Sequence, residues 1–504
     1  MDCPVCVVGL AGSVLACGRF SRGASGLRCA YAAHNQGICR ILLPFLRLKI
    51  WRRGGSFRFG VLFCRSTDWL TFTILQQCCS LRATTAPRDI ARTGSMTATT
   101  DFIRKTSSAL APQVIAWRRF FHQYPEVSGE EIFTSAALCA ELEKMGVPYR
   151  RLPAADGISA TGIIATIKGT APDAYDAEGN PKHRVALRTD IDGLPVTEQT
   201  GAVYASQNAG VMHACGHDCH MAMMLGAVQL LRHMTDQIHG EVRVLFQPAE
   251  ENSLGSRYMM ENGALDGVDA IFGTHIWSEV PAGKFSCEAG ARMANCDWFE
   301  VDIQGVSAHG SMPHLGIDAI VVGAEIVNSL QVLVSRDVSP FDPVVITVGK
   351  FTGGEARNII AGSAKLEGTV RTWSDAMREE VPRRMERIVE EVAGSFGATA
   401  KLTYSAGNPA LYNDAHYAET ARQAVVEVLG EDALTAYRGT LSGEDFSEYL
   451  HKVPGVFVFL GTNNPEIGAT HPQHSCYYSV DEDVLVRGSM VAAQWACDQL
   501  GPEA

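Results

Sequence analysis

The stretch "HRVALRTDIDGLP" (residues 183–195) has the composition of a buried strand that runs into an acidic turn. It is followed by "CHMAMMLGAVQLLRHM" (219–234), whose apolar residues recur at helical spacing, and by "EVRVLFQPAEE" (241–251), an apolar strand stopped by a proline. A further strand, "GVDAIFGTHIW" (267–277), comes next. Because strands and helices alternate in this way, we predict an α/β fold with a mostly parallel sheet covered by helices on both faces.

The pattern changes near residue 293. From there the sequence indicates a strand, a helix, two strands, a helix and a strand, which is the order of a ferredoxin-like α+β domain. After this segment the larger pattern resumes. We therefore predict one catalytic domain built from residues 100–292 and 407–504, with a smaller domain, residues 293–406, inserted between its two segments.

Residues 1–95 differ in composition from the rest of the chain. They hold twelve Arg and one Lys against three Asp, a balance of +10, so the remaining residues carry −22. Such an Arg-rich, acid-poor segment fits an organellar transit peptide. The alternative that we favour is that Met96 is the true start and that the upstream stretch is an artefact of the gene model. In either case we expect no contribution to the fold.

Bulk composition narrows the class of protein. The formal net charge of −12 disfavours nucleic acid or an anionic membrane as the main partner. The run "ICRILLPFLRLKIW" (38–51) is too short and too charged to span a bilayer. Eight of the 15 cysteines lie before residue 96, and the other seven are scattered without a disulfide-like framework, which suits a reducing compartment. We expect a cytoplasmic protein, with organellar targeting by residues 1–95 as the alternative.

Metal-binding and acid–base side chains follow the predicted strands. They are Asp190 and Asp192 after the first strand, Glu250 and Glu251 after the second, His275 after the third, Cys215 and His217 in the loop "HACGHDCH" (213–220), and His471 and His474 after the later strand "GVFVFLGT" (455–462). Ligands of open parallel sheets bind beyond the carboxyl ends of the strands. A thiolate, imidazoles and carboxylates at one rim favour zinc, manganese or cobalt. A redox role for "CGHDC" is disfavoured because its cysteines are four apart, unlike a C-x-x-C dithiol.

Nine motifs, in order, resemble the amidohydrolase branch of the M20 metallopeptidases. They are "RTDIDGLPV", "HACGHDCHMAMMLGA", "FQPAEEN", "GTHIW", "GVSAHGSMPHLGIDAI", "GGEARNII", "LEGTVRTW", "SGEDFSEY" and "HSCYYSVDED". That branch includes hippurate hydrolases, N-acyl-amino-acid amidohydrolases and plant hydrolases of indole-acetyl-amino acids. The resemblance runs from about residue 110 to the end. Two positions depart from the usual family pattern: "NIIAG" stands where "N-x-I-P" is common, and Cys476 stands where a small residue or proline is more usual.

The resemblance implies a centre of two divalent metal ions, zinc or manganese, with cobalt possible. Matched position by position, the implied ligands are Cys215, His217, Glu251, His275 and His474, with Cys215 as the bridging thiolate. Glu250 matches the general base of amide hydrolysis, and Asp192 matches an aspartate that orients a ligand imidazole. Neighbouring side chains of an extended segment point apart, so we expect Glu251 to hold metal while Glu250 faces the water.

The resemblance implies that the inserted domain serves dimerisation or acts as a lid, and it implies three further residues there. His309 matches the family histidine that stabilises the oxyanion, and by resemblance it serves the active site of the partner subunit of a homodimer. Asn358 matches an asparagine that helps bind the free carboxylate of the substrate, and Arg357 beside it is a weaker candidate.

The predicted activity is hydrolysis of an N-acyl or N-aroyl amino acid to a carboxylic acid and a free amino acid. A carboxypeptidase or dipeptidase on the same scaffold is the close alternative, because the sequence does not reveal what recognises the acyl side. An alternative of another class is a non-catalytic metal-binding scaffold protein. Loss of Glu250 or of a ligand would favour that alternative, and none is lost.

Overall fold

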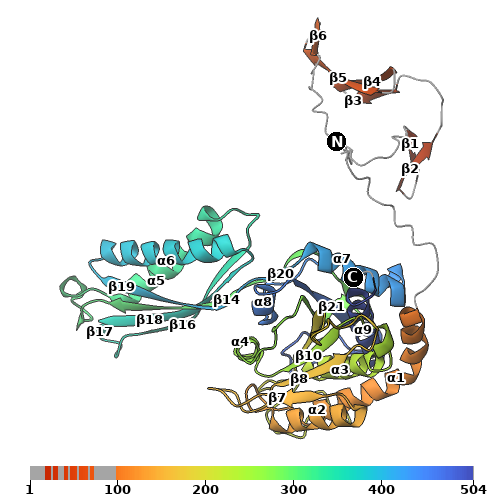
Figure 1. Ribbon diagram of the computed structural model, residues 1–504. Coiled ribbons are helices and arrows are strands. Elements are labelled where there is room, and N and C mark those ends of the chain that lie inside the picture. The colour runs from red at the N-terminus through yellow and green to blue at the C-terminus, as the bar shows by residue number, and fades with distance from the viewer. Residues whose placement is uncertain are drawn as a thin grey trace. The chain divides into compact units, whose positions relative to one another are not determined.

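The computed structural model describes residues 98–502 throughout and, before them, the backbone of six short strands (Figure 1). The chain divides into two compact units, Met1–Thr93 and Gly94–Ala504. In the first unit β1 (Gly18–Gly23) and β2 (Gly26–Tyr31) form a hairpin, and β3 (Cys39–Leu43), β4 (Leu46–Arg53), β5 (Ser56–Arg65) and β6 (Asp68–Phe72) form an antiparallel sheet. Met96, the start that we favour, lies outside the described residues.

The second unit is built around a seven-stranded sheet. Its order is β12 (Phe285–Ser286), β21 (Gly455–Asn463), β11 (Ala270–Pro281), β9 (Arg184–Asp190), β10 (Glu241–Gln247), β8 (Ile163–Lys168) and β7 (Tyr149–Arg151). The four strands β21, β11, β9 and β10 run parallel, whereas β12, β8 and β7 pair antiparallel at the edges. The carboxyl ends of the four parallel strands therefore meet at one rim.

Helices cover both faces of this sheet, as the alternation predicts. One face carries α1 (Ala98–Gln123), α2 (Ile132–Met145), α3 (His217–Leu231), α7 (Ala415–Leu429) and α9 (Leu485–Gln499), and the other carries α4 (Gly255–Glu261) and α8 (Phe446–Leu450). Leu187 packs into the core under the face that carries α3, and its neighbour Ala186 packs into the core under the face that carries α4, because successive strand residues face opposite sides. The fold prediction is confirmed.

The chain leaves the seven-stranded sheet to form a second sheet before it returns. This sheet has the antiparallel order β16 (Val344–Gly353), β18 (Ser363–Thr372), β14 (Cys296–Gln304) and β19 (Thr399–Asn408). The helices α5 (Ala319–Val332) and α6 (Asp375–Ser395) lie along one of its faces (Figure 1). The chain order β14, α5, β16, β18, α6, β19 is ferredoxin-like, which confirms that part of the fold prediction.

The run Ala319–Asp337, which includes α5, is long and apolar enough to count as a candidate membrane span by composition, with 33% of its most apolar window buried. Five of its residues pack into the core of the inserted domain: Ala319, Val322, Ile326, Leu330 and Leu333. Other apolar residues of the run, Ile320, Val321 and Val332, are exposed.

Candidate metal centre

A glycine turn brings the "HACGHDCH" loop against the rim of the sheet. Gly216 precedes α3 with a left-handed φ of 98°, and a side chain there would meet Ile276 Cδ1 at 2.4 Å. Glycine is the residue that tolerates both this backbone conformation and this approach. The turn therefore places Cys215 and His217 next to the part of β11 that carries His275.

The five predicted ligands lie in one group. Cys215 Sγ lies 3.5 Å from His275 Nε2, and Glu251 Oε1 lies 3.9 Å from His217 Nε2 and 3.5 Å from His474 Nε2. The ligand atoms of Cys215, His217 and Glu251 are all within 4.8 Å of one another. His474 comes from the second segment of the catalytic domain, and its backbone N–H donates to Ala214 O at 2.8 Å, which joins it to the cysteine loop.

Hydrogen bonds fix which nitrogen of two imidazoles faces the centre. His217 Nδ1 donates to Asp192, at 2.9 Å to its carbonyl oxygen and 3.2 Å to its Oδ1, and His275 Nδ1 donates to Ile276 O at 2.6 Å. Each Nε2 is then left with its lone pair towards the other ligands. Metal-binding histidines are oriented in this way. The structure thus gives Asp192 the contacts that its predicted orienting role requires.

The donor set fits a divalent cation. Among the described residues, His217 Nε2 and Glu251 Oε1 are buried without a hydrogen-bond partner, although each such atom costs about 1–3 kcal/mol when it is left unpaired. Burial disfavours a charged His217, but the carboxylates of Asp190 and Asp192 outweigh it and raise the pKa of His217 to about 10. An environment that favours a proton on this imidazole also favours a metal cation bound to it.

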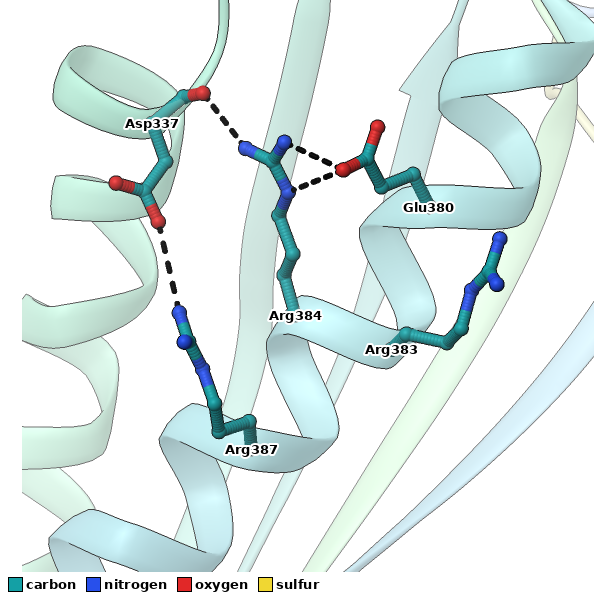
Figure 2. A pocket seen from close by; sticks show the side chains of 5 residues that line it. All are labelled: Asp337, Glu380, Arg383, Arg384 and Arg387. Atoms are coloured by element: carbon teal, nitrogen blue, oxygen red, sulfur yellow. Dashed lines mark hydrogen bonds and ion pairs between the residues drawn. The ribbon is translucent and has the colours of Figure 1, made fainter.

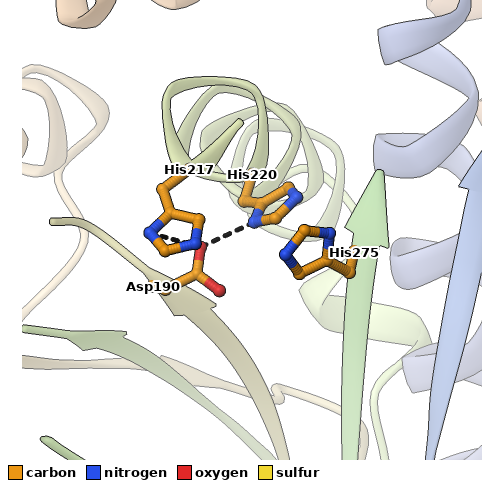
Figure 3. A group of neighbouring side chains, drawn as sticks. All are labelled: Asp190, His217, His220 and His275. Carbon is orange, nitrogen blue, oxygen red and sulfur yellow. Dashed lines mark hydrogen bonds and ion pairs between the residues drawn. The ribbon is translucent and has the colours of Figure 1, made fainter. Parts of the chain in front are cut away.

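Beneath the ligands, Asp190 pairs with His220, a residue that the sequence analysis did not identify (Figure 3). His220 Nδ1 donates to Asp190 Oδ1 at 2.6 Å, and His220 Nε2 accepts the N–H of Ile276 at 2.9 Å. Both nitrogens of His220 are occupied, so this residue supports the rim and leaves metal binding to His217 and His275. Its signal in the sequence was its position one helical turn after His217, on the same face of α3.

Glu250 lies in a different environment from Glu251. It is buried, its Oε1 accepts the N–H of Asp445 at 3.3 Å, and its carboxylate lies within 4.8 Å of those of Glu444 and Asp445. Burial and the negative charges of Glu444 and Glu251 raise the pKa of Glu250 well above its usual range. A carboxylate raised in this way is a stronger base than an exposed one, which suits a group that accepts a proton from water.

The segment that carries this pair is a turn, and the expectation of an extended segment is wrong. Pro248 follows the last residue of β10, Ala249 adopts a left-handed φ of 55°, and the N–H of Ser253 donates to Glu250 O at 2.8 Å. The chain must reverse here to enter α4. The two glutamates nevertheless point apart, because the turn directs Glu251 to the imidazoles and Glu250 to the Asp445 backbone.

A buried arginine compensates the carboxylates on the Glu250 side. Arg188 makes ion pairs with Asp190 at 2.7 Å, with Asp445 at 2.7 Å and with Glu444 at 3.0 Å. The sequence analysis missed this residue, although an arginine inside an apolar strand is an unusual feature that could have indicated it. Arg188 thus links β9 to the segment of Glu444 and Asp445, whose backbone N–H binds Glu250.

The inserted domain brings two of its predicted residues together. His309 in β15 (Ala308–His309) pairs with Ile359 in β17 (Ile359–Ile360), and the N–H of Gly310 donates to Asn358 O at 2.8 Å. Both His309 and Asn358 are exposed, as is Arg357. Strand pairing therefore presents His309 and Asn358 side by side at the surface of this domain.

A hollow of about 640 Å³ also lies on the inserted domain, lined by Asp337, Glu380, Arg383, Arg384 and Arg387 (Figure 2). Arg384 is bonded to the carboxylate of Glu380 and the carbonyl of Asp337, and Arg387 pairs with the Asp337 carboxylate at 3.9 Å. Its lining contains no thiol or imidazole. The rim of the catalytic sheet is therefore the better candidate for chemistry.

The sequence comparisons agree with this geometry. The model of peptidase family M20/M25/M40 matches residues 186–498. The chain belongs to this family. Among its M20 relatives, the N-acetyl-L-cysteine deacetylase of Bacillus subtilis (strain 168) is 38% identical over 76% of this chain and 87% of that protein. Thermostable carboxypeptidase 1 of Saccharolobus solfataricus is 36% identical over 75% of this chain and 93% of that protein. The predicted family is confirmed, and with it the class of amide-cleaving hydrolases.

A solved M20 structure shares the fold. The YxeP protein of Bacillus subtilis, described as a dinuclear metal-binding peptidase of the M20 family, is 33% identical with a TM-score of 0.67, over 78% of this chain and 99% of that chain. That description and the donor groups at the rim agree that the M20 centre of this chain binds metal.

Proposed function

We propose that this protein hydrolyses the amide bond of N-acyl amino acids, releasing a carboxylic acid and a free amino acid. The observation that carries the proposal is the different partners of two neighbouring carboxylates: Glu251 faces two imidazoles, and Glu250 accepts the Asp445 N–H. One side can hold metal while the other moves a proton. The name of the deacetylase relative supports an acyl amino acid as substrate.

We further propose that the centre holds two ions, zinc or manganese, through Cys215, His217, Glu251, His275 and His474. A thiolate with several imidazoles and a carboxylate suits these metals. When bound, such ions act as a Lewis acid on the scissile carbonyl and lower the pKa of a bound water. Elemental analysis of protein purified without chelator should give about two equivalents per subunit, and one equivalent or less with full activity would refute a dinuclear centre.

Glu250 is the proton-transfer group of this proposal. Its carboxylate takes a proton from the attacking water and passes it to the leaving nitrogen, so the amine departs as a neutral group. The Asp445 N–H directs one carboxylate oxygen, which leaves the other for the proton. Because both steps use the same group, Glu250→Gln should stop turnover at the first step.

We propose that His309 stabilises the oxyanion in the active site of a partner subunit, with Asn358 and Arg357 binding the substrate carboxylate. His309 and Asn358 are neighbours across the β15–β17 pair, so one surface can present both groups to a substrate. The inserted domain would then be the dimerisation surface, and a lone subunit would lack a complete site.

Subunit mixing tests the shared site. Glu250→Gln and His309→Ala chains are each inactive alone, and they are mixed in equal amounts under conditions that allow exchange. If His309 acts across the interface, half of the dimers are mixed and each has one intact site, so about a quarter of wild-type activity returns. Glu250→Gln mixed with itself is the control. A mixture that stays inactive after exchange is shown by native mass spectrometry would refute the shared site.

A carboxypeptidase activity is the second candidate, and the name of the carboxypeptidase relative favours it at nearly the same identity. A panel of N-acetyl amino acids, N-benzoyl amino acids, indole-acetyl amino acids and dipeptides separates the two. The proposal expects the highest kcat/KM on an N-acyl amino acid. A dipeptide preferred over every acyl amino acid would replace it with peptidase activity.

A further inference from the structure

We propose that Glu131 is a positioning residue, which holds the turn that presents Glu250 and Glu251 in opposite directions. This inference rests on the proposed function, since it assigns a role in the same site. Glu131 lies 118 residues before Ala249, is fully buried, and belongs to the loop between α1 and α2.

The carboxylate of Glu131 is completely engaged. Its Oε1 accepts the N–H of Gly129 at 2.7 Å and the N–H of Ala249 at 2.9 Å, and its Oε2 accepts the hydroxyl of Thr161 at 3.0 Å. Gly129 has a φ of 84°, and a side chain there would meet Gly157 O at 2.2 Å. The loop therefore needs a glycine at 129 in order to bring Glu131 under the turn.

Ala249 is one of two residues of the turn, with Ser253, that carry a side chain in the left-handed conformation. Its φ of 55° is the left-handed conformation, which is unfavourable for a residue with a side chain. Its carbonyl oxygen accepts the N–H of Gly255 at 3.0 Å at the start of α4, and its N–H donates to Glu131. Ala249 is thus held from both sides, and Glu131 provides the amide side.

The same loop reaches the ligands at a second point. The hydroxyl of Ser128 donates to Asp192 Oδ2 at 2.6 Å, and the N–H of Glu251 donates to the same oxygen at 3.1 Å. Glu131 fixes the residue before Glu250, and Asp192 fixes the residue after it. A shift of the turn at Ala249 would therefore move the Glu250 carboxylate while Glu251 remained attached to Asp192.

The environment of Glu131 supports a specific role. Burial and the negative charge of Asp192 raise the pKa of Glu131 to about 7, although three N–H groups oppose that shift. Keeping a carboxylate where its charged form is disfavoured has a cost in stability. Glutamine offers the same shape without that cost, and its amide oxygen could still accept both N–H groups while its NH₂ faces Thr161.

Glu126 offers a matched control on the same loop. Its carboxylate also accepts two backbone N–H groups, from Phe133 at 3.0 Å and Thr134 at 2.8 Å, at the start of α2. Neither partner belongs to the turn. Glu126→Ala therefore removes a comparable pair of hydrogen bonds without removing a contact to Ala249.

The experiment compares Glu131→Ala, Glu131→Gln and Glu126→Ala for kcat, KM and metal content, with the substrate that the wild type cleaves best. Because misplacement of a reacting group by about 1 Å can cost about 10²-fold, we expect Glu131→Ala to lower kcat by about 10–100-fold. KM and metal content should stay near wild type. Glu131→Gln should retain most of the activity, and Glu126→Ala should keep kcat within about twofold, since no site residue moves.

A rescue variant separates positioning from general destabilisation. Glycine at position 249 adopts the left-handed conformation without penalty, so Glu131→Ala combined with Ala249→Gly should regain part of the lost kcat. A folded, metal-loaded Glu131→Ala protein with wild-type kcat would overturn the proposal, as would equal losses in Glu131→Ala and Glu126→Ala. Loss of metal without loss of kcat at saturating metal would show that Glu131 supports the metal ligands rather than Glu250.

Hydrogen exchange provides a readout that does not depend on the substrate. The amide hydrogens of residues 249–254 should exchange faster in Glu131→Ala than in wild type, and Glu126→Ala should leave them unchanged. Unchanged exchange in both variants would refute the support that we assign to Glu131. If the wild type cleaves no acyl amino acid, the proposed function fails, while this exchange measurement still decides whether Glu131 holds the turn.

Discussion

Glu250 and Glu251 are adjacent in the chain, yet the two sides of the site that they enter differ in charge and in partners. Glu251 faces the imidazoles of His217 and His474, and one of its oxygens is buried without a hydrogen-bond partner among the described residues. Glu250 faces the carboxylates of Glu444 and Asp445 and accepts a backbone N–H. A glutamate side chain is thus suited to bind a cation at position 251 and a proton at position 250. Environment decides the role.

The largest expected effect comes from removing the metal, which should act on the ligand side alone. Dialysis against a chelator should abolish turnover and lower the melting temperature, because a ligand that binds only the folded state stabilises it. Zinc or manganese added back should restore both. Activity that persists after elemental analysis shows no metal would contradict the assignment of the ligand side.

Substitution of the proposed base should lower turnover without removing metal. Glu250→Gln removes the proton acceptor but leaves every proposed ligand in place, so kcat should fall by about 10²–10⁴-fold or more, because the same group serves both proton transfers. Circular dichroism should show an unchanged fold. Turnover within about tenfold of wild type would show that another group is the base.

Substitution of Asp192 should have a smaller effect on the metal ligands. It accepts hydrogen bonds from His217 Nδ1, Ser128 and the N–H of Glu251, so it joins two ligand loops. Substitution of such an outer partner typically costs about 10–100-fold in metal affinity or activity. We expect Asp192→Asn to weaken metal binding, measured by competition with a chromophoric chelator. At saturating metal its kcat should recover, and a kcat that stays low would place Asp192 on the base side.

The smallest effect concerns pH. Burial and the charge of Glu444 raise the pKa of Glu250, and a base must be deprotonated to act, so the acid limb of kcat/KM should lie above the usual range of a glutamate. Glu444→Gln removes that negative charge, lowers the pKa of Glu250 and should move the acid limb to lower pH. A pH profile of both proteins checks the sign. A shift to higher pH would contradict the coupling of these two carboxylates.

The sequence was most informative where local pattern and chain order sufficed. Alternating strands and helices predicted the parallel sheet, and the motifs predicted which residues gather at its rim. The missed residues, Arg188, His220 and Glu131, all act through partners far away in the chain or through backbone groups. No pattern of spacing shows that a buried glutamate will meet the N–H of Ala249, because that contact exists only after the sheet has formed.

The error at the glutamate pair has the same origin. The motif "FQPAEEN" continues an apolar strand, which favours an extended segment, but α4 must begin soon after it and Gly255 packs against the carbonyl of Pro248. Tertiary packing therefore requires a turn. The divergence of Glu250 and Glu251 was predicted, while its cause is the left-handed conformation of Ala249.

One measurement tests the division between the two sides most directly: the metal content of wild type, Glu250→Gln and Glu251→Gln, purified side by side without chelator. Wild type and Glu250→Gln should each hold about two equivalents per subunit, because their ligands are intact. Glu251→Gln should hold less, since its carboxylate faces both His217 and His474. Full metal in Glu251→Gln together with depleted metal in Glu250→Gln would reverse the assignment and contradict the account.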